Sequence, residues 1–81
     1  MATPRALVAL AQNGANQDEY VKRHQRGDWG DVDPGDAEAN AIALAESLPI
    51  TSAYTLGDGT RLWLITEGDR SATTILLADE Y

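Results

Sequence analysis

The apolar residues change their periodicity at Leu48–Pro49, and this change limits the folds that the chain can adopt. Before this point, apolar side chains recur every three or four residues, which is the spacing of helices. After it, residues 50–56 and 61–67 are rich in Thr, Tyr, Trp, Ile and Leu, which favour extended structure. The sequence therefore predicts an α+β fold, with three short helices followed by a three-stranded antiparallel β-meander.

The three helices are predicted over residues 4–12, 16–27 and 34–47. The first and third begin with the same signal, a capping side chain followed by a proline, at Thr3–Pro4 and at Asp33–Pro34. Asn16 opens the second helix, with Glu19 placed for a capping box, and Gly27 closes it. In the third helix, close approach to a neighbouring layer is predicted for the face made of Ala37, Ala41, Leu44 and Leu48.

A tight hairpin is predicted at residues 57–60, between the first two strands. Asp58 and Gly59 tolerate the positive φ values of a type I′ turn. With these two as the central turn residues, Tyr54 would pair with Trp63. One face would then carry Ser52, Tyr54, Trp63 and Ile65, and the other Ala53, Leu62 and Leu64. A third strand over residues 73–78 would complete the meander.

Several classes of protein are excluded by length and composition. A chain of 81 residues is too short for two hydrophobic cores, so we expect one small domain, residues 1–81. Without cysteine and with one histidine, it has no disulfide framework, no thiolate nucleophile and no usual zinc site, so we expect no metal and no cofactor. Residues 31–42 fail as a calcium loop, because Ile42 stands where a glutamate is required. No membrane span or signal peptide is recognisable, which predicts a soluble cytoplasmic protein.

The chain is acidic, with thirteen Asp and Glu residues against six Lys and Arg residues and a net charge of −7. This balance disfavours direct binding to nucleic acid and favours a protein partner with a basic surface. The candidate partner-binding residues are Asp28, Trp29, Asp31, Asp33, Asp36 and Glu38. The same carboxylates also suit helix starts and a solvated surface, and Trp29 also suits a plug between the second and third helices.

His24, Arg26 and Arg70 are candidates for structural or ligand-binding roles. His24 falls on the apolar face of the second helix, and Asp28 or Asp31 is close enough in sequence to orient its imidazole as an acid–base pair. Arg70 suits an anion or an internal pair with the acidic loop over residues 28–36. No catalytic residue is assigned, because no serine stands in a nucleophile-elbow context.

Several motifs resemble a family of small bacterial proteins that are described as hypothetical or plasmid-related. The resemblance lies in His24, the block Arg26–Gly27–Asp28–Trp29–Gly30–Asp31, the loop Asp69–Arg70–Ser71 and the segment Thr73–Leu77, and it covers most of the chain. It implies a mobile-element setting and no particular activity. The alanine-rich third helix departs from the family pattern.

Three functions from different classes follow from these observations. We expect a small acidic, non-enzymatic protein of mobile-element origin that blocks a basic site on a larger protein, such as a host defence nuclease of the CRISPR or restriction type. One alternative is a homo-oligomeric accessory protein, for example a homodimer, whose strands pair across an exposed sheet edge. The other is a small ligand-binding enzyme centred on His24, Asp28 and Arg70, which requires a pocket that unites these side chains.

Overall fold

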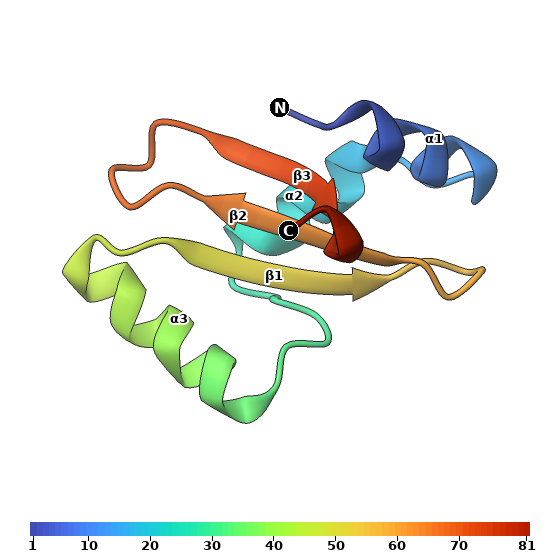
Figure 1. Cartoon of the computed structure of the whole chain (residues 1–81). Helices are drawn as coiled ribbons and strands as arrows, with labels where there is room; N and C mark the ends of the chain where they lie inside the picture. Colours follow the sequence, from blue (N-terminus) through green and yellow to red (C-terminus); the bar gives the residue numbers. More distant parts are fainter.

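The computed structural model describes residues 1–81 and contains three helices, a three-stranded sheet and a final 3-10 turn (Figure 1). In chain order the elements are α1 (Pro4–Gln12), α2 (Gln17–Gln25), α3 (Pro34–Glu46), β1 (Ile50–Thr55), β2 (Arg61–Thr66), β3 (Thr73–Leu77) and η1 (Ala78–Glu80). The predicted α+β arrangement, with an antiparallel meander after three helices, is confirmed. No helix has the length and apolar character needed to cross a membrane.

Local capping groups determine where the helices begin. Each predicted capping residue accepts a hydrogen bond from a backbone N–H group in the first turn: Thr3 from Ala6, Asn16 from Asp18 and Asp33 from Asp36. These bonds satisfy N–H groups that have no partner inside the helix. Because capping involves residues only two or three positions apart, the sequence alone was enough to place the helix starts.

The hairpin between β1 and β2 differs from the prediction by one residue. Tyr54 pairs with Leu62, and Ala53 pairs with Trp63, so the predicted pairing of Tyr54 with Trp63 is wrong. The turn is a three-residue loop, in which the Leu56 N–H donates to the Thr60 carbonyl at 2.8 Å and Gly59 alone has a positive φ. A loop of this type contains one residue more than a type I′ turn and shifts the register accordingly.

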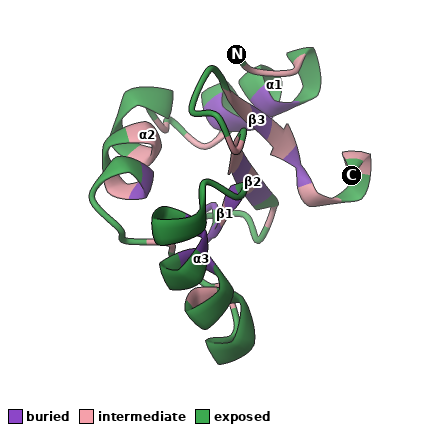
Figure 2. Cartoon of the chain, turned by 90° about the vertical axis from the view of Figure 1, so that its left-hand side faces the viewer, coloured by how far each residue is buried: buried purple, intermediate pink, exposed green.

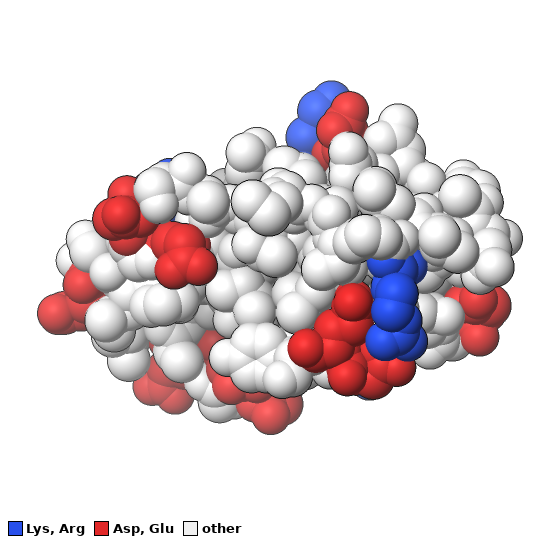
Figure 3. All heavy atoms as spheres, turned by 45° about the horizontal axis from the view of Figure 1, so that its top comes forward, with Lys and Arg blue, Asp and Glu red and all other residues white.

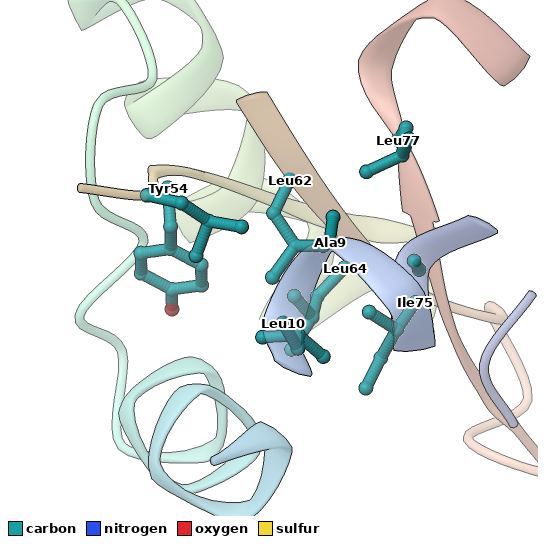
Figure 4. Packing of buried hydrophobic residues seen from close by; sticks show 9 residues of the cluster. Ala9, Leu10, Tyr54, Leu62, Leu64, Ile75 and Leu77 are labelled. Atoms are coloured by element: carbon teal, nitrogen blue, oxygen red, sulfur yellow. The ribbon is translucent and has the colours of Figure 1, made fainter. Parts of the chain in front are cut away.

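The corrected register places the core on one face of the sheet, which α1 and α2 cover (Figures 1 and 4). Its central side chains are the buried residues Ser52, Tyr54, Leu62, Leu64, Ile75 and Leu77. Ala6, Ala9 and Leu10 pack against it from α1, and Tyr20 and Val21 pack against it from α2. We call this side of the sheet the covered face.

The opposite face carries Thr51, Ala53, Trp63, Ile65, Thr74 and Leu76, and we call it the open face. Trp63, Ile65 and Leu76 are only partly buried. The predicted grouping of Trp63 and Ile65 with Tyr54 is therefore wrong, because a shift of one residue moves a side chain to the opposite face.

The edge of β1 is occupied by the segment that follows α2 and by α3. The Ala53 N–H donates to the carbonyl of Trp29 at 3.0 Å, and the Asp31 N–H donates to the carbonyl of Ala53 at 2.6 Å. Two residues before Ala53 on the same strand, the backbone of Thr51 forms two hydrogen bonds with the Asn40 side chain. The backbone groups of Thr51 and Ala53 that point away from β2 are therefore already paired.

The edge of β3 is occupied by the N-terminal segment. The Ile75 N–H donates to the carbonyl of Met1 at 2.7 Å, and the Thr3 N–H donates to the carbonyl of Ile75 at 2.9 Å. Farther along, the Leu77 N–H donates to the Glu80 carboxylate at 2.9 Å. Both outer strands thus have internal partners, which is a common protection against edge-to-edge association.

The helix α3 lies along the edge of β1 and covers neither face of the sheet (Figure 2). Only Asn40 and Ala43 are buried in it, whereas Leu44 is 59% exposed and Leu48, just beyond it, is 49% exposed. The expected packing of the face made of Ala37, Ala41, Leu44 and Leu48 is wrong. The hydrogen bonds of Asn40 with the strand edge set the orientation of the helix instead.

Candidate functional site

The segment between α2 and α3 carries most of the candidate partner-binding residues and is held against β1 by its backbone. Gly30 lies so close to the sheet that a Cβ atom there would overlap the Ala53 carbonyl and the Tyr54 ring. Its φ of +71° is also a value that glycine adopts readily. The close approach places Asp31 beside the open face and Asp33 at the start of α3.

Asp28 is engaged within the chain. Its carboxylate accepts hydrogen bonds from Arg23 at 2.7 Å and 3.3 Å, and the Arg23 guanidinium lies 4.5 Å from the centre of the Tyr54 ring. The hydrogen bond from Arg23 lowers the pKa of Asp28. The Tyr54 hydroxyl donates to the Asp28 carbonyl at 2.6 Å, so this residue links α2, the segment and the sheet.

A trough of about 520 Å³ runs over the open face between the start of α3 and the C-terminal residue. Asp31, Asp33 and Asp36 line one side. The remaining lining includes Ala53, Arg61, Trp63, Ile65 and Tyr81. We call this hollow the acidic trough. Glu38 is exposed on α3 and does not line it.

The three carboxylates of the acidic trough form no ion pair. The ion pairs of the chain are Arg5 with Asp79 and Arg23 with Asp28. Asp31 accepts a hydrogen bond from the Thr55 hydroxyl at 2.8 Å, and Asp33 caps α3. Arg61 is the one basic residue of the lining. On the face drawn in Figure 3, acidic side chains likewise occupy more of the surface than basic ones.

Two aromatic side chains adjoin these carboxylates. The rings of Trp63 and Tyr81 are 5.0 Å apart between centroids and inclined at 54°, and Tyr81 is 80% exposed. Sequence reasoning missed both residues as site residues. The predicted register placed Trp63 on the same face as Tyr54, and only the three-residue loop brings it to the open face.

A second pocket, of about 480 Å³, lies between the end of α2 and the end of α3. It brings together His24, Arg26, Trp29 and Arg70, but Asp28 does not line it. The pocket that an enzyme centred on His24, Asp28 and Arg70 would require is therefore formed only in part.

His24 is buried and binds two hydroxyl groups of the sheet. Its Nδ1 atom lies 2.5 Å from Ser52 Oγ, and its Nε2 atom lies 2.7 Å from Thr66 Oγ1. Burial lowers the pKa of His24, so the imidazole is neutral at pH 7. The alternative of an acid–base pair of His24 with Asp28 or Asp31 is therefore wrong, and His24 is a structural residue whose partners come from the sheet and not from the segment around Trp29. Ser52 is completely buried, so its hydroxyl cannot reach a substrate despite its contact with the imidazole.

Arg70 is bound to the end of α3. Its guanidinium donates to the carbonyls of Ala43 at 2.9 Å and Leu48 at 2.8 Å, and also to those of Glu67 and Gly68. The hypothesis that Arg70 pairs with the acidic loop is wrong, because backbone carbonyls take up its guanidinium and it forms no ion pair. A cation at this end stabilises the helix, whose last carbonyls carry partial negative charge.

No group of three or more His, Asp or Glu side chains gathers in a way that suits a metal ion. The two hollows offer charged groups, hydrogen-bonding groups and aromatic rings. The chain matches no family model, no curated protein and no solved structure.

Proposed function

We propose that this chain is a small, non-enzymatic binding protein that receives an arginine-containing segment of a larger protein in the acidic trough. The observation that carries the proposal is the combination of three carboxylates without ion pairs and the aromatic pair of partly buried Trp63 and exposed Tyr81 around one hollow. Neither feature alone is specific, since carboxylates also cap helices and aromatic residues also fill cores.

The two features favour arginine over other side chains. A guanidinium forms paired hydrogen bonds with carboxylates and stacks on aromatic rings. Asp31 and Asp36 would supply the acceptors, and Trp63 with Tyr81 the rings. The negative potential of the trough would also raise the association rate with a basic partner.

The size of the trough favours a short segment. A hollow of about 520 Å³ holds a few side chains, in the range of small-molecule and peptide sites. A basic loop at the edge of a nucleic-acid cleft has suitable dimensions and charge. Occupation of such a cleft would block a nuclease. A mobile-element setting, which the resemblance in the sequence implies, suits a host defence nuclease as the target, and we place this target in the cytoplasm.

The two alternatives have less support. Pairing of copies across a sheet edge would have to displace the partners of Ala53 and Thr51 on one side or of Ile75 on the other. An enzyme centred on His24, Asp28 and Arg70 would lack a common pocket, because Asp28 does not line the pocket that contains His24 and Arg70. A binding role requires neither the displacement of these strand partners nor a shared catalytic pocket.

The proposal can be tested with a fluorescein-labelled hexa-arginine peptide and fluorescence anisotropy. In the variant D31N/D36N, we expect the Kd for the peptide to rise about tenfold at low salt, because two charge interactions of about 0.5–1 kcal/mol are lost. The difference should shrink at high salt. The matched control is E46Q, which removes one charge from the opposite end of α3, outside the trough.

The variant W63L separates the aromatic contribution from the charge. If arginine stacks on the ring, this variant should weaken hexa-arginine more than hexa-lysine. A localised site would be contradicted if the loss of binding free energy in D31N/D36N were no more than twice the loss in E46Q, since the loss would then follow only the number of charges removed. The partner itself can then be sought by capture from nuclease-treated bacterial lysate, with D31N/D36N as the negative control.

A further inference from the structure

The second pocket, between the ends of α2 and α3, has the opposite charge to the rest of the molecule. Ten residues line it: His24, Gln25, Arg26, Gly27, Trp29, Leu44, Ile50, Thr66, Arg70 and Thr73. None is acidic and two are arginines, although acidic residues outnumber basic ones by thirteen to six in the whole chain. A basic hollow in an acidic protein points to an anionic ligand.

The two arginines of this pocket differ in their hydrogen-bond partners. Arg70 is fixed by four backbone carbonyls and so holds its charge in one place. Its bonds also occupy carbonyls at the end of α3, which would otherwise repel an anion. Arg26, the residue that follows α2, makes no ion pair or side-chain hydrogen bond in the chain, whereas Arg5 and Arg23 are each paired with an aspartate. The Arg26 guanidinium is therefore free to bind.

A chain of hydrogen bonds leads from the core to the pocket. Ser52 contacts His24, His24 contacts Thr66, and Thr66 Oγ1 lies 2.8 Å from Thr73 Oγ1. Thr66 and Thr73 both line the pocket. The buried imidazole thereby orients hydroxyl groups that are suited to the oxygen atoms of a ligand.

The remaining wall is apolar. Trp29 is partly buried, Ile50 is buried, and Leu44 is exposed, and all three line the pocket. The indole ring of Trp29 offers a flat surface that a planar group can cover. The pocket thus has a charged side with hydroxyl groups and an apolar side, and its volume of about 480 Å³ is typical of sites for small molecules.

We propose that this pocket binds a small anion in which a phosphate or carboxylate contacts Arg26 and Thr73, and an attached planar apolar group lies against Trp29. The inference is independent of the acidic trough, with which the pocket shares no lining residue.

To test the proposal, the full chain is titrated with each probe, and binding is monitored by the NMR chemical shifts of the backbone amides and of the Trp indole N–H groups. The probes are phenyl phosphate, benzoate, inorganic phosphate and neutral benzamide. We expect phenyl phosphate or benzoate to shift the Trp29 indole and the amides of Thr66 and Thr73. Whichever of these two probes has the lower Kd shows whether the pocket prefers a phosphate or a carboxylate. Inorganic phosphate and benzamide should each bind at least fivefold more weakly, because each lacks one half of the ligand.

Two variants test whether the positive charge of Arg26 contacts the anion. R26Q should raise the Kd of the preferred aryl anion five- to tenfold, whereas K22Q, which removes one positive charge from the last turn of α2 outside the pocket, should change it less than twofold. Arg26 has no side-chain partner, so R26Q should fold normally, which its amide spectrum will show. Equal effects of R26Q and K22Q, shifts centred on Trp63, or no binding by either aryl anion would overturn the proposal.

Discussion

Asn40 and Thr51 are joined by two hydrogen bonds, in which a side-chain amide takes the place of a neighbouring strand. Asn40 Nδ2 donates to the Thr51 carbonyl at 2.7 Å, and the Thr51 N–H donates to Asn40 Oδ1 at 3.0 Å. An asparagine amide matches the backbone in having one acceptor and donors side by side. This pair attaches α3 to the sheet, although almost all other side chains of the helix are exposed.

Replacement of Asn40 by leucine should detach α3 from β1. The variant retains a side chain of similar size but leaves the backbone groups of Thr51 without partners, so we expect a loss of about 1–3 kcal/mol in the free energy of unfolding. This loss can be measured by urea denaturation monitored by circular dichroism. The control I42A alters an exposed residue of the same helix and should change stability by less than about 0.5 kcal/mol. Equal effects of the two variants would contradict the role of Asn40.

The stability of the protein should depend on pH through His24. Burial lowers the pKa of His24 below its ordinary value of 6.5, so the unfolded chain takes up a proton at higher pH than the folded chain. The free energy of unfolding is therefore at its maximum above pH 6.5. It decreases as the pH falls from 6.5 towards the pKa of the folded state, by at most about 1.4 kcal/mol per pH unit.

The variant H24Q isolates this effect. Its stability should be lower than that of the wild type at pH 7.5 but nearly constant from pH 7.5 to pH 5. The carboxyl groups with lowered pKa, among them Asp28 and Glu80, act only at lower pH, because their ordinary values are 3.8 and 4.5. Urea unfolding at intervals of half a pH unit will show the difference. A wild-type protein without a slope near pH 6 would contradict the burial of a neutral imidazole.

The contact between Gly30 and the sheet should tolerate no side chain. In G30A the new methyl group would overlap the Ala53 carbonyl and the Tyr54 ring, and we expect a loss of at least about 3 kcal/mol. Gly27 also has a positive φ, of +86°, but nothing lies within 4 Å of a Cβ atom there. G27A should therefore cost only about 1 kcal/mol. Thermal unfolding of both variants separates steric overlap from backbone strain, and a larger loss in G27A would contradict the close approach.

The register of the hairpin can be tested with two neighbouring residues. Leu64 is completely buried on the covered face, so L64A should lower the free energy of unfolding by about 2–5 kcal/mol. Ile65 is partly buried on the open face, and I65A should cost roughly half as much or less. Denaturant unfolding of the two variants will measure this difference. The opposite order would show that Ile65 belongs to the core.

The sequence was sufficient where the interactions are local. Thr3, Asn16 and Asp33 bond to N–H groups two or three residues away, so the helix starts follow from neighbouring residues. The positions of the strands and of the hairpin also follow from short segments. Within the hairpin, however, the residues Gly57–Asp58–Gly59 suit either a two-residue or a three-residue loop, and the choice between them decides the side on which Trp63 lies.

The candidate sites depend on contacts between distant residues, which the sequence did not reveal. His24 meets Ser52 and Thr66, and Arg70 meets the end of α3, because burial and helix ends require hydrogen-bond partners wherever the fold supplies them. No pattern in the sequence distinguishes these partners from the nearby aspartates. Trp63 and Tyr81, which complete the acidic trough, were missed for the same reason.

The sequence by itself determined the fold class, the helix starts, the place of the hairpin and the excess of negative charge. Tertiary structure decided the strand register, the orientation of α3, the closing of both sheet edges and the separation of an acidic trough from a basic pocket. The physical reason is distance along the chain. Caps and turns are satisfied by adjacent residues, whereas strand edges, buried side chains and helix ends are satisfied by groups that only the folded chain brings together.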